Sequence, residues 1–359
     1  MLRRRSERHG TARIERDSFV GRDAGDDTRL GEGQAGARPG LDIRRHRPNM
    51  ARHYKGLIRI DRLLRRFRTA AGKAMIENRA RLTRRAFFCN ALAGESDYNI
   101  SVNCDMTVSC NCQDDGGAGI IGDLAKDELA AIFEGPTASR FRRVLAQGRL
   151  PIDTCAVCGE LRGSSREEAD LLARQFHVPN RGIMVENTVA CNLECVGCER
   201  SRVLGARSKI RLEREDIARI SETIQACNIK TVHYFKYGEP FVSPSILDEL
   251  QAIRAGNPAV RIVLSTNGQA LDTGAQRDAA MLADIIFCSV DGSSNDVLGR
   301  YQRGGTFDRA YANMKDLVEY RNNAGSTAPY IEWKYVLFNW NDRRKEIERA
   351  VRLAEEAGV

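Results

Sequence analysis

Three cysteines in one short segment are the residues most suited to metal chemistry. Cys191, Cys195 and Cys198 occur in the run CNLECVGC, directly after an apolar segment that we expect to form a strand. Three thiolates at this spacing can ligate three irons of a four-iron cluster. No fourth cysteine lies nearby in the sequence, so one iron would stay open to a small-molecule ligand. Taken alone, the same spacing also fits a zinc site.

A second group of cysteines precedes this run. Cys104, Cys110 and Cys112 come before the segment GGAGIIGDL, and Cys155 and Cys158 form a CxxC pair further on. Four of these five thiolates would fully ligate a second iron-sulfur cluster. We favour Cys110, Cys112, Cys155 and Cys158, with Cys104 as the rival ligand. Zinc is the alternative metal, because a four-cysteine site with a CxxC half is also typical of zinc ribbons.

The other cysteines have simpler interpretations. Cys227 lies on the apolar stripe of an expected helix and Cys288 lies within an apolar strand, so we expect both to be buried as small hydrophobic residues, and Cys89 has no assigned role. His233, inside another apolar strand, is expected to line the core or a pocket wall.

Strand and helix candidates alternate from residue 181 to the end. The expected strands are 182–188, 231–236, 261–266, 284–290 and 330–337. The expected helices lie near 212–227, 244–255, 276–283, 307–323 and 342–357. This order predicts right-handed crossovers and an α/β fold with a parallel sheet, open or curled into a barrel. An earlier helix is expected near 126–147, among short strands and turns.

Short polar motifs follow three of these strands: YGEP at 237–240, STNG at 265–268 and SVDG at 289–292. Parallel sheets bind their ligands at the carboxyl ends of strands. Together with the cysteine run, the ordered motifs resemble those of the radical S-adenosylmethionine enzymes, over residues 181–359. The segment RYQRGGTF at 300–307 also resembles the arginine- and glycine-containing segment of many of these enzymes.

The resemblance implies a role for each motif. The methionyl amino group would be held by Gly238, Glu239 and Pro240, and the ribose would lie near Ser265, Thr266 and Asn267. Ser289 belongs to a segment that precedes substrate- or cofactor-contacting residues, and we take Asp291 as a candidate catalytic base or substrate contact. The implied fold is a partial (β/α) barrel of about five to six βα units, preceded by a small cysteine-rich domain.

The implied reaction begins at a [4Fe-4S] cluster. One-electron reduction would cleave S-adenosylmethionine (SAM), and the 5′-deoxyadenosyl radical would abstract a hydrogen atom from a peptide, protein or small-molecule substrate. Such an oxidoreductase or peptide-modifying enzyme needs a reductant such as flavodoxin or ferredoxin. A non-catalytic iron-sulfur electron carrier or sensor is the alternative from another class, and it would bind clusters without cleaving SAM.

The earlier cysteines resemble the auxiliary-cluster domains named SPASM and Twitch, although those domains usually follow the barrel. Enzymes with such domains commonly modify peptides or proteins, and a minority are dehydrogenases or epimerases of sugars and cyclitols. The auxiliary cluster would accept or relay an electron, or bind the substrate.

Three departures from the family pattern stand out. Gly197 occupies a position that is usually aromatic and touches adenine, so adenine must pack elsewhere, and Tyr237 replaces the first glycine of the family's GGEP motif. The chain also ends after five strand-helix units, where six are usual, so either it is a C-terminally incomplete core or the sixth strand is supplied differently.

The basic residues are concentrated near the N-terminus. Of the net charge of +8, residues 1–50 carry +4 and residues 51–88 carry +10, which leaves −6 on the rest. We predict a disordered extension over 1–50, with a start codon at Met50 as the alternative. A basic amphipathic helix is predicted over 51–88, with the apolar stripe Leu57, Ile60, Leu64, Phe67, Ala71, Met75 and Leu82.

The remaining domain divisions are an auxiliary-cluster domain over 89–165, a linker over 166–180 and the SAM-binding core over 181–359. The basic helix packs on its own protein or docks on an acidic partner or a membrane surface. An RNA substrate would rest on the basic segment alone, so nucleic acid is not an expected partner. Without an apolar leader or a spanning segment, we expect a cytoplasmic protein.

Overall fold

The computed structural model describes residues 69–359. The predicted extension over 1–50 and the first part of the predicted helix, 51–68, lie outside the described residues.

One mixed sheet of eight strands organises this part of the chain, in the order β10-β9-β8-β7-β6-β2-β3-β4. Neighbouring strands from β6 to β10 pair in parallel. Their bounds are Gly182–Val185 for β6, Thr231–His233 for β7, Arg261–Thr266 for β8, Ile285–Ser289 for β9 and Tyr330–Lys334 for β10. All five lie within the predicted segments, which are rich in β-branched and other apolar residues.

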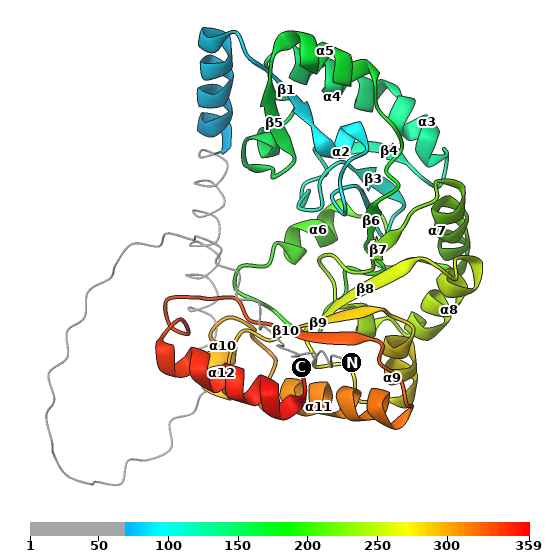
Figure 1. Cartoon of the computed structure of the whole chain (residues 1–359), viewed down its shortest axis with the longest axis vertical. Helices are drawn as coiled ribbons and strands as arrows, with labels where there is room; N and C mark the ends of the chain where they lie inside the picture. Colours follow the sequence, from blue (N-terminus) through cyan, green and yellow to red (C-terminus); the bar gives the residue numbers. More distant parts are fainter. Residues whose placement is uncertain (1–68) are drawn as a thin grey trace, which may run out of the picture.

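Helices follow these strands in sequence. The five long ones are α7 (Arg214–Ala226), α8 (Ile246–Gly256), α9 (Gly274–Met281), α11 (Phe307–Asn323) and α12 (Arg344–Ala357). They confirm the expected alternation. Two shorter helices, α6 (Arg200–Ala206) and α10 (Asn295–Gly299), follow the cysteine run and the SVDG motif. In Figure 1, α9, α11 and α12 lie together beside the β9 and β10 end of the sheet.

The cysteine-rich segment continues the same sheet. Strand β2 (Ser101–Val102) pairs in parallel with β6, Ser101 opposite Met184 and Val102 opposite Val185. Strands β3 (Thr107–Ser109) and β4 (Ile120–Asp123) extend it with antiparallel pairings. The two halves of the chain therefore share backbone hydrogen bonds, and one apolar core runs through both of them.

A second, two-stranded sheet completes the N-terminal half. Strand β1 (Ala86–Cys89) pairs antiparallel with β5 (Leu161–Ser164). Around it lie α2 (Asn90–Ala93), α3 (Leu129–Glu134), α4 (Pro136–Ala146), the 3-10 helix η2 (Asp153–Val157) and α5 (Arg166–Arg174). Figure 1 shows β1, β5, α4 and α5 at the end of the molecule opposite α11 and α12.

Two local features differ from the sequence expectation. The single helix expected near 126–147 is divided at Gly135, whose backbone is extended and which precedes Pro136 at the first position of α4. The segment expected to be a linker, 166–180, begins with α5, because the Ser165 hydroxyl accepts a hydrogen bond from Glu168 N and caps that helix.

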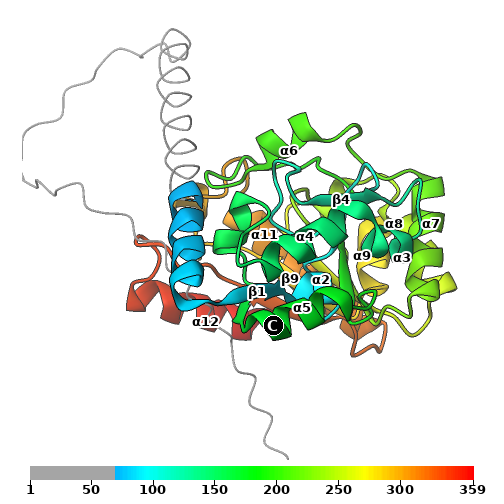
Figure 2. The same cartoon turned by 90° about the horizontal axis from the view of Figure 1, so that it is seen from above.

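The helix over 69–83 does not use its predicted apolar stripe. Met75 and Leu82 are 69% and 80% exposed, whereas Ala80 is 2% exposed and Ile76 packs against the core. Polar contacts fix this orientation, since Glu77 accepts a hydrogen bond from Leu150 N at 2.7 Å. Within the described part of this helix, which lies beside β1 in Figure 2, Met75 and Leu82 of the predicted stripe therefore do not pack on the chain itself.

Between residues 69 and 359, no helix combines the length and apolar character that crossing a membrane requires.

Candidate functional site

The CNLECVGC run forms a loop between β6 and α6. The segment that follows α10 binds the backbone of this loop: Val196 N donates to Tyr301 O at 3.0 Å, and Glu194 N donates to Arg303 O at 2.9 Å. Cys191 and Cys195 are partly buried and Cys198 is exposed. Burial, followed by the neighbouring thiols of Cys198 and Cys191, raises the pKa of Cys195 to about 12. The loop thus gathers all three predicted thiols at one place.

Glu239 is the buried acid of the YGEP motif and is 2% exposed. Its carboxylate accepts hydrogen bonds from Thr266 Oγ1 at 2.8 Å, from Asn267 N at 2.7 Å and from Phe241 N at 3.3 Å. Burial raises its pKa to about 7, against the lowering effect of these donors. Because the Glu239 carboxylate is already shielded from water, little further desolvation of it is needed when it neutralises an ammonium group.

Gly238 has no room for a side chain. A Cβ atom placed on it would lie 2.0 Å from Thr188 O and 2.8 Å from Ala190 O, just before the cysteine loop. The Glu239 N–H donates to Ala190 O at 2.9 Å. Residues 238 and 239 therefore pack backbone to backbone on the start of the cysteine loop.

Asn267 joins the STNG motif to the same loop. Its side-chain amide lies 2.8 Å from Asn192 Oδ1 and 3.7 Å from Cys191 Sγ, while its backbone N–H binds Glu239. The cysteine loop, the YGEP motif and the STNG motif thus meet at the carboxyl ends of β6, β7 and β8.

The fourth motif lies next to them. Ser289 Oγ is 3.0 Å from Ser265 Oγ. Asp291 is 4% exposed, its Oδ1 accepts from Val336 N at 2.9 Å, and burial raises its pKa to about 6. The Asp291 N–H donates to Gln302 Oε1 at 2.8 Å, and Gln302 follows Tyr301, whose backbone carbonyl accepts from the cysteine loop. A buried carboxyl group with this pKa can exchange a proton near neutral pH.

An aromatic surface covers the position of Gly197. A Cβ atom placed on Gly197 would lie 3.4 Å from Tyr301 Cε2. The Tyr301 ring packs on Phe338 with centroids 4.6 Å apart, and Phe338 stacks on Trp340 at 4.6 Å with 6° between the ring planes. The sequence gives no sign of this contact, because these rings come from a different part of the chain.

The earlier cysteines do not all gather at one point. Four thiols line one small cavity: Cys89, Cys110, Cys155 and Cys158. Cys112 lies outside this lining and donates to Asn99 Oδ1 at 3.1 Å, and Cys104 donates to Lys209 O at 3.2 Å. Cys89 had no predicted role. Only the pairing of β1 with β5, far apart in sequence, brings it to the others.

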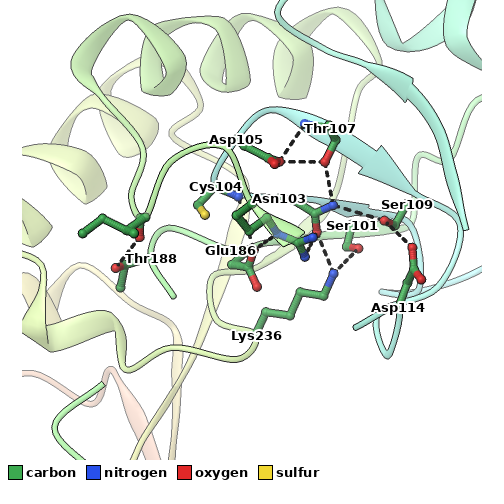
Figure 3. A network of polar contacts seen from close by, with 12 residues as sticks. Ser101, Asn103, Cys104, Asp105, Thr107, Ser109, Asp114, Glu186, Thr188 and Lys236 are labelled. Atoms are coloured by element: carbon green, nitrogen blue, oxygen red, sulfur yellow. Dashed lines mark hydrogen bonds and ion pairs between the residues drawn. The ribbon is translucent and has the colours of Figure 1, made fainter. Parts of the chain in front are cut away.

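Buried charges connect the two halves of the sheet (Figure 3). Glu186, which follows β6, binds Arg207 at 2.8 Å, and Arg207 donates to Asn103 Oδ1 at 2.9 Å. Lys236 reaches the same Asn103 oxygen at 2.7 Å and Ser101 Oγ at 3.0 Å. Burial lowers the pKa of Lys236. Sequence reasoning missed this network, because its members are isolated polar residues in four separate segments.

The remaining predicted residues are placed as follows. Cys288 is fully buried, as predicted, and Cys227 packs against the core while partly exposed. His233 lies between the rings of Tyr98 and Phe235, at centroid distances of 5.5 and 6.0 Å. Across residues 69–359, no three His, Cys, Asp or Glu side chains are already close enough to hold a single metal ion.

Residues 185–331 match the family model described as the radical SAM superfamily. This range begins at the end of β6 and covers the cysteine loop and the three motifs at the strand ends. The radical SAM match therefore coincides with the residues that the structure brings together. No curated protein matches the chain.

Solved structures with similarity include BtrN in complex with AdoMet and 2-DOIA, at 18% identity and a TM-score of 0.30, covering 36% of this chain and 50% of that one. Native anSMEcpe with bound AdoMet has 15% identity and a TM-score of 0.38, with 49% of each chain covered. TYW1 with a lysine-pyruvate adduct has 16% identity and a TM-score of 0.36, covering 50% of this chain and 62% of that one. The chain spans about half the length of the first two.

Proposed function

We propose that this chain is a radical SAM enzyme whose catalytic cluster binds Cys191, Cys195 and Cys198. The observation that carries the proposal is the position of Asn267, which bonds through its backbone to Glu239 at 2.7 Å and places its side chain 3.7 Å from Cys191 Sγ. The predicted metal loop and the predicted cofactor acid are therefore joined through one residue.

The residues present fit a cluster with bound SAM. Three thiols on one loop suit three irons, and a buried carboxylate suits the cofactor's ammonium group. When bound and reduced, the cluster would supply the electron for the cleavage of SAM. Glu239 and the backbone of Gly238 and Pro240 would hold the amino group, and Ser265, Thr266 and Asn267 would lie along the ribose. The ring of Tyr301 would pack on adenine in place of an aromatic residue at 197.

Asp291 is the candidate for proton transfer or substrate contact. Its carboxyl group is buried near the cysteine loop, and its pKa of about 6 favours the charged form at neutral pH while keeping the proton accessible. A peptide or protein is the substrate class that we favour, and a sugar or cyclitol is the alternative. Flavodoxin or ferredoxin would be the reductant, in the cytoplasm.

We further propose that the N-terminal half is an auxiliary iron-sulfur domain of the SPASM or Twitch kind, and that the strand-helix half is a partial barrel. The basic helix near the N-terminus would dock on an acidic partner or a membrane surface. The strongest support for an auxiliary cluster is the gathering of thiols from distant segments at one cavity.

The test is anaerobic reconstitution with iron and sulfide, followed by dithionite and SAM. We expect 5′-deoxyadenosine from the intact chain and none from a variant with Cys191, Cys195 and Cys198 all changed to alanine. A reconstituted chain that binds iron and forms no 5′-deoxyadenosine would instead support a non-catalytic electron carrier or sensor.

A further inference from the structure

Three distant segments bring four thiols to one cavity. Cys89 ends β1, Cys110 follows β3, and Cys155 and Cys158 belong to η2 and its carboxyl end. The rest of the lining is Asn111 and apolar side chains, among them Leu92, Phe141 and Ile152. A cavity with four sulfur atoms and an otherwise apolar wall suits thiolate-bound metal, because such a metal compensates the buried charge.

The backbone fixes the position of each thiol. In the β1-β5 pairing, Cys89 lies opposite Leu161, three residues after Cys158. Asn90 N also donates to Glu160 O at 3.0 Å, which holds the end of β1 beside the CxxC segment. Cys110 N donates to Gly119 O at 2.9 Å. Regular hydrogen bonding, rather than loop conformation alone, therefore places Cys89 at the cavity.

The four thiols share the wall of one cavity, and among residues 69–359 no charged side chain is part of that wall. A metal bound there would take them as thiolates, since coordinated thiols lose their protons.

Cys112 and Cys104 have other partners. The Cys112 thiol donates to Asn99 Oδ1 at 3.1 Å. The Cys104 thiol donates to Lys209 O at 3.2 Å and lies beside the charges of Glu186 and Arg207. Neither lines the cavity. Cys89 thus replaces Cys112 in the set of four that the sequence favours.

We propose that Cys89, Cys110, Cys155 and Cys158 are the four protein ligands of one iron-sulfur cluster. We infer the four ligands from the lining of the cavity alone. The choice of iron and sulfide over zinc rests on the proposed function, because a radical SAM enzyme already requires an iron-sulfur cluster to be assembled in this chain. Four thiolates occupy every ligand position of such a cluster. This centre would pass electrons or stabilise the fold, and would leave no iron open to a substrate.

The experiment uses the full chain in which Cys191, Cys195 and Cys198 are all alanine, so that any iron belongs to the second site. After anaerobic reconstitution, iron, sulfide and zinc are measured per chain, and the reduced cluster is followed by electron paramagnetic resonance. We expect this parent to hold one cluster. Adding Cys89→Ala should lower its iron at least tenfold, whereas the matched variants Cys112→Ala and Cys104→Ala should keep it.

Folding is controlled by circular dichroism and by a milder variant. In Cys89→Ser the hydroxyl oxygen can still bind iron, so we expect retained iron with a shifted resonance spectrum. Full iron and an unchanged spectrum in the serine variant would overturn the proposal, even where the alanine variant fails to fold. So would loss of the cluster in a folded Cys112→Ala variant, or stoichiometric zinc in the parent.

This test of the ligand set can fail or succeed independently of the test of the proposed function. Formation of 5′-deoxyadenosine depends on Cys191, Cys195 and Cys198, which this parent lacks. A chain with those cysteines intact that failed to cleave SAM would refute the proposed function, and the iron content of the parent would still decide the ligand set.

Discussion

The ring of Tyr301 lies directly against the backbone of Gly197, so that a Cβ atom on Gly197 would be 3.4 Å from Tyr301 Cε2. Gly197, which precedes the last cysteine of the loop, therefore contacts an aromatic ring from the segment that follows β9. A Cβ atom at 197 would be in van der Waals contact with the Tyr301 ring.

Replacing Tyr301 with leucine tests the adenine contact. Stacking of a base on an aromatic ring is worth about 1–3 kcal/mol, so the Kd for SAM should rise roughly 5- to 150-fold. The matched variant Tyr301→Phe keeps the ring and should bind nearly as the parent does. Equilibrium dialysis of the reconstituted protein measures the Kd. Equal affinity in the leucine variant, at unchanged iron content, would show that adenine packs elsewhere.

The change Glu239→Gln tests the cofactor acid. The amide keeps the size of the side chain but loses its charge and one acceptor, while Thr266 and Asn267 still direct donors at it. We expect the KM for SAM to rise at least tenfold, about 1.4 kcal/mol, with iron bound as before. Rates of 5′-deoxyadenosine formation over a range of SAM concentrations give the KM. A parent-like KM would remove Glu239 from the site.

His233 predicts how stability depends on pH. Burial lowers its pKa from 6.5 to about 4, with Asp97 raising it and Lys334 lowering it to smaller extents. His233 is therefore protonated near pH 6.5 in the unfolded chain but only near pH 4 in the folded chain. The stability from this group is present above pH 6.5 and is lost as the pH falls towards 4, by at most about 3 kcal/mol.

The variant His233→Gln cannot titrate, so its unfolding free energy should fall less than that of the parent between pH 6.5 and 4. Urea unfolding of the metal-free chain at several pH values provides the comparison. Parallel pH profiles for the two proteins would contradict the prediction.

The buried ion pair between Glu186 and Arg207 predicts a large effect on stability when one partner is removed. Both side chains are almost fully buried, at 0% and 1% exposure. Arg207→Met leaves a buried carboxylate without its partner, and we expect a loss of about 3–5 kcal/mol in unfolding free energy. Adding Glu186→Met removes that charge and should recover part of the loss. Urea unfolding of both variants measures the difference, and a double variant no more stable than the single one would contradict this account.

Local patterns predicted much of the strand-helix half. Apolar runs such as RIVLST fixed strand positions, and the motif residues Glu239 and Asn267 lie together because parallel strands end at one edge. The position of Cys89 beside Cys110, Cys155 and Cys158 could not be predicted, since it depends on pairing between β1 and β5 across more than sixty intervening residues. The exposure of Met75 and Leu82 could not be predicted either, because periodicity shows amphipathic character and does not show which face meets a neighbour within the chain.

The parallel pairing of β2 with β6 was not predicted either. Parallel partners need no short connection, so nothing in the local sequence of Ser101–Val102 marks its neighbour.

If both proposed centres are present, that pairing would constrain electron transfer between them. A centre at Cys110, directly after β3, and a centre at Cys191, in the loop after β6, would each be attached to a strand of one hydrogen-bonded sheet, with only β2 between the two strands. Their separation would then be a constant of the fold rather than the result of domain encounters. Electrons could then tunnel between the two centres without a preceding diffusional motion, and the rate of transfer would not depend on solvent viscosity.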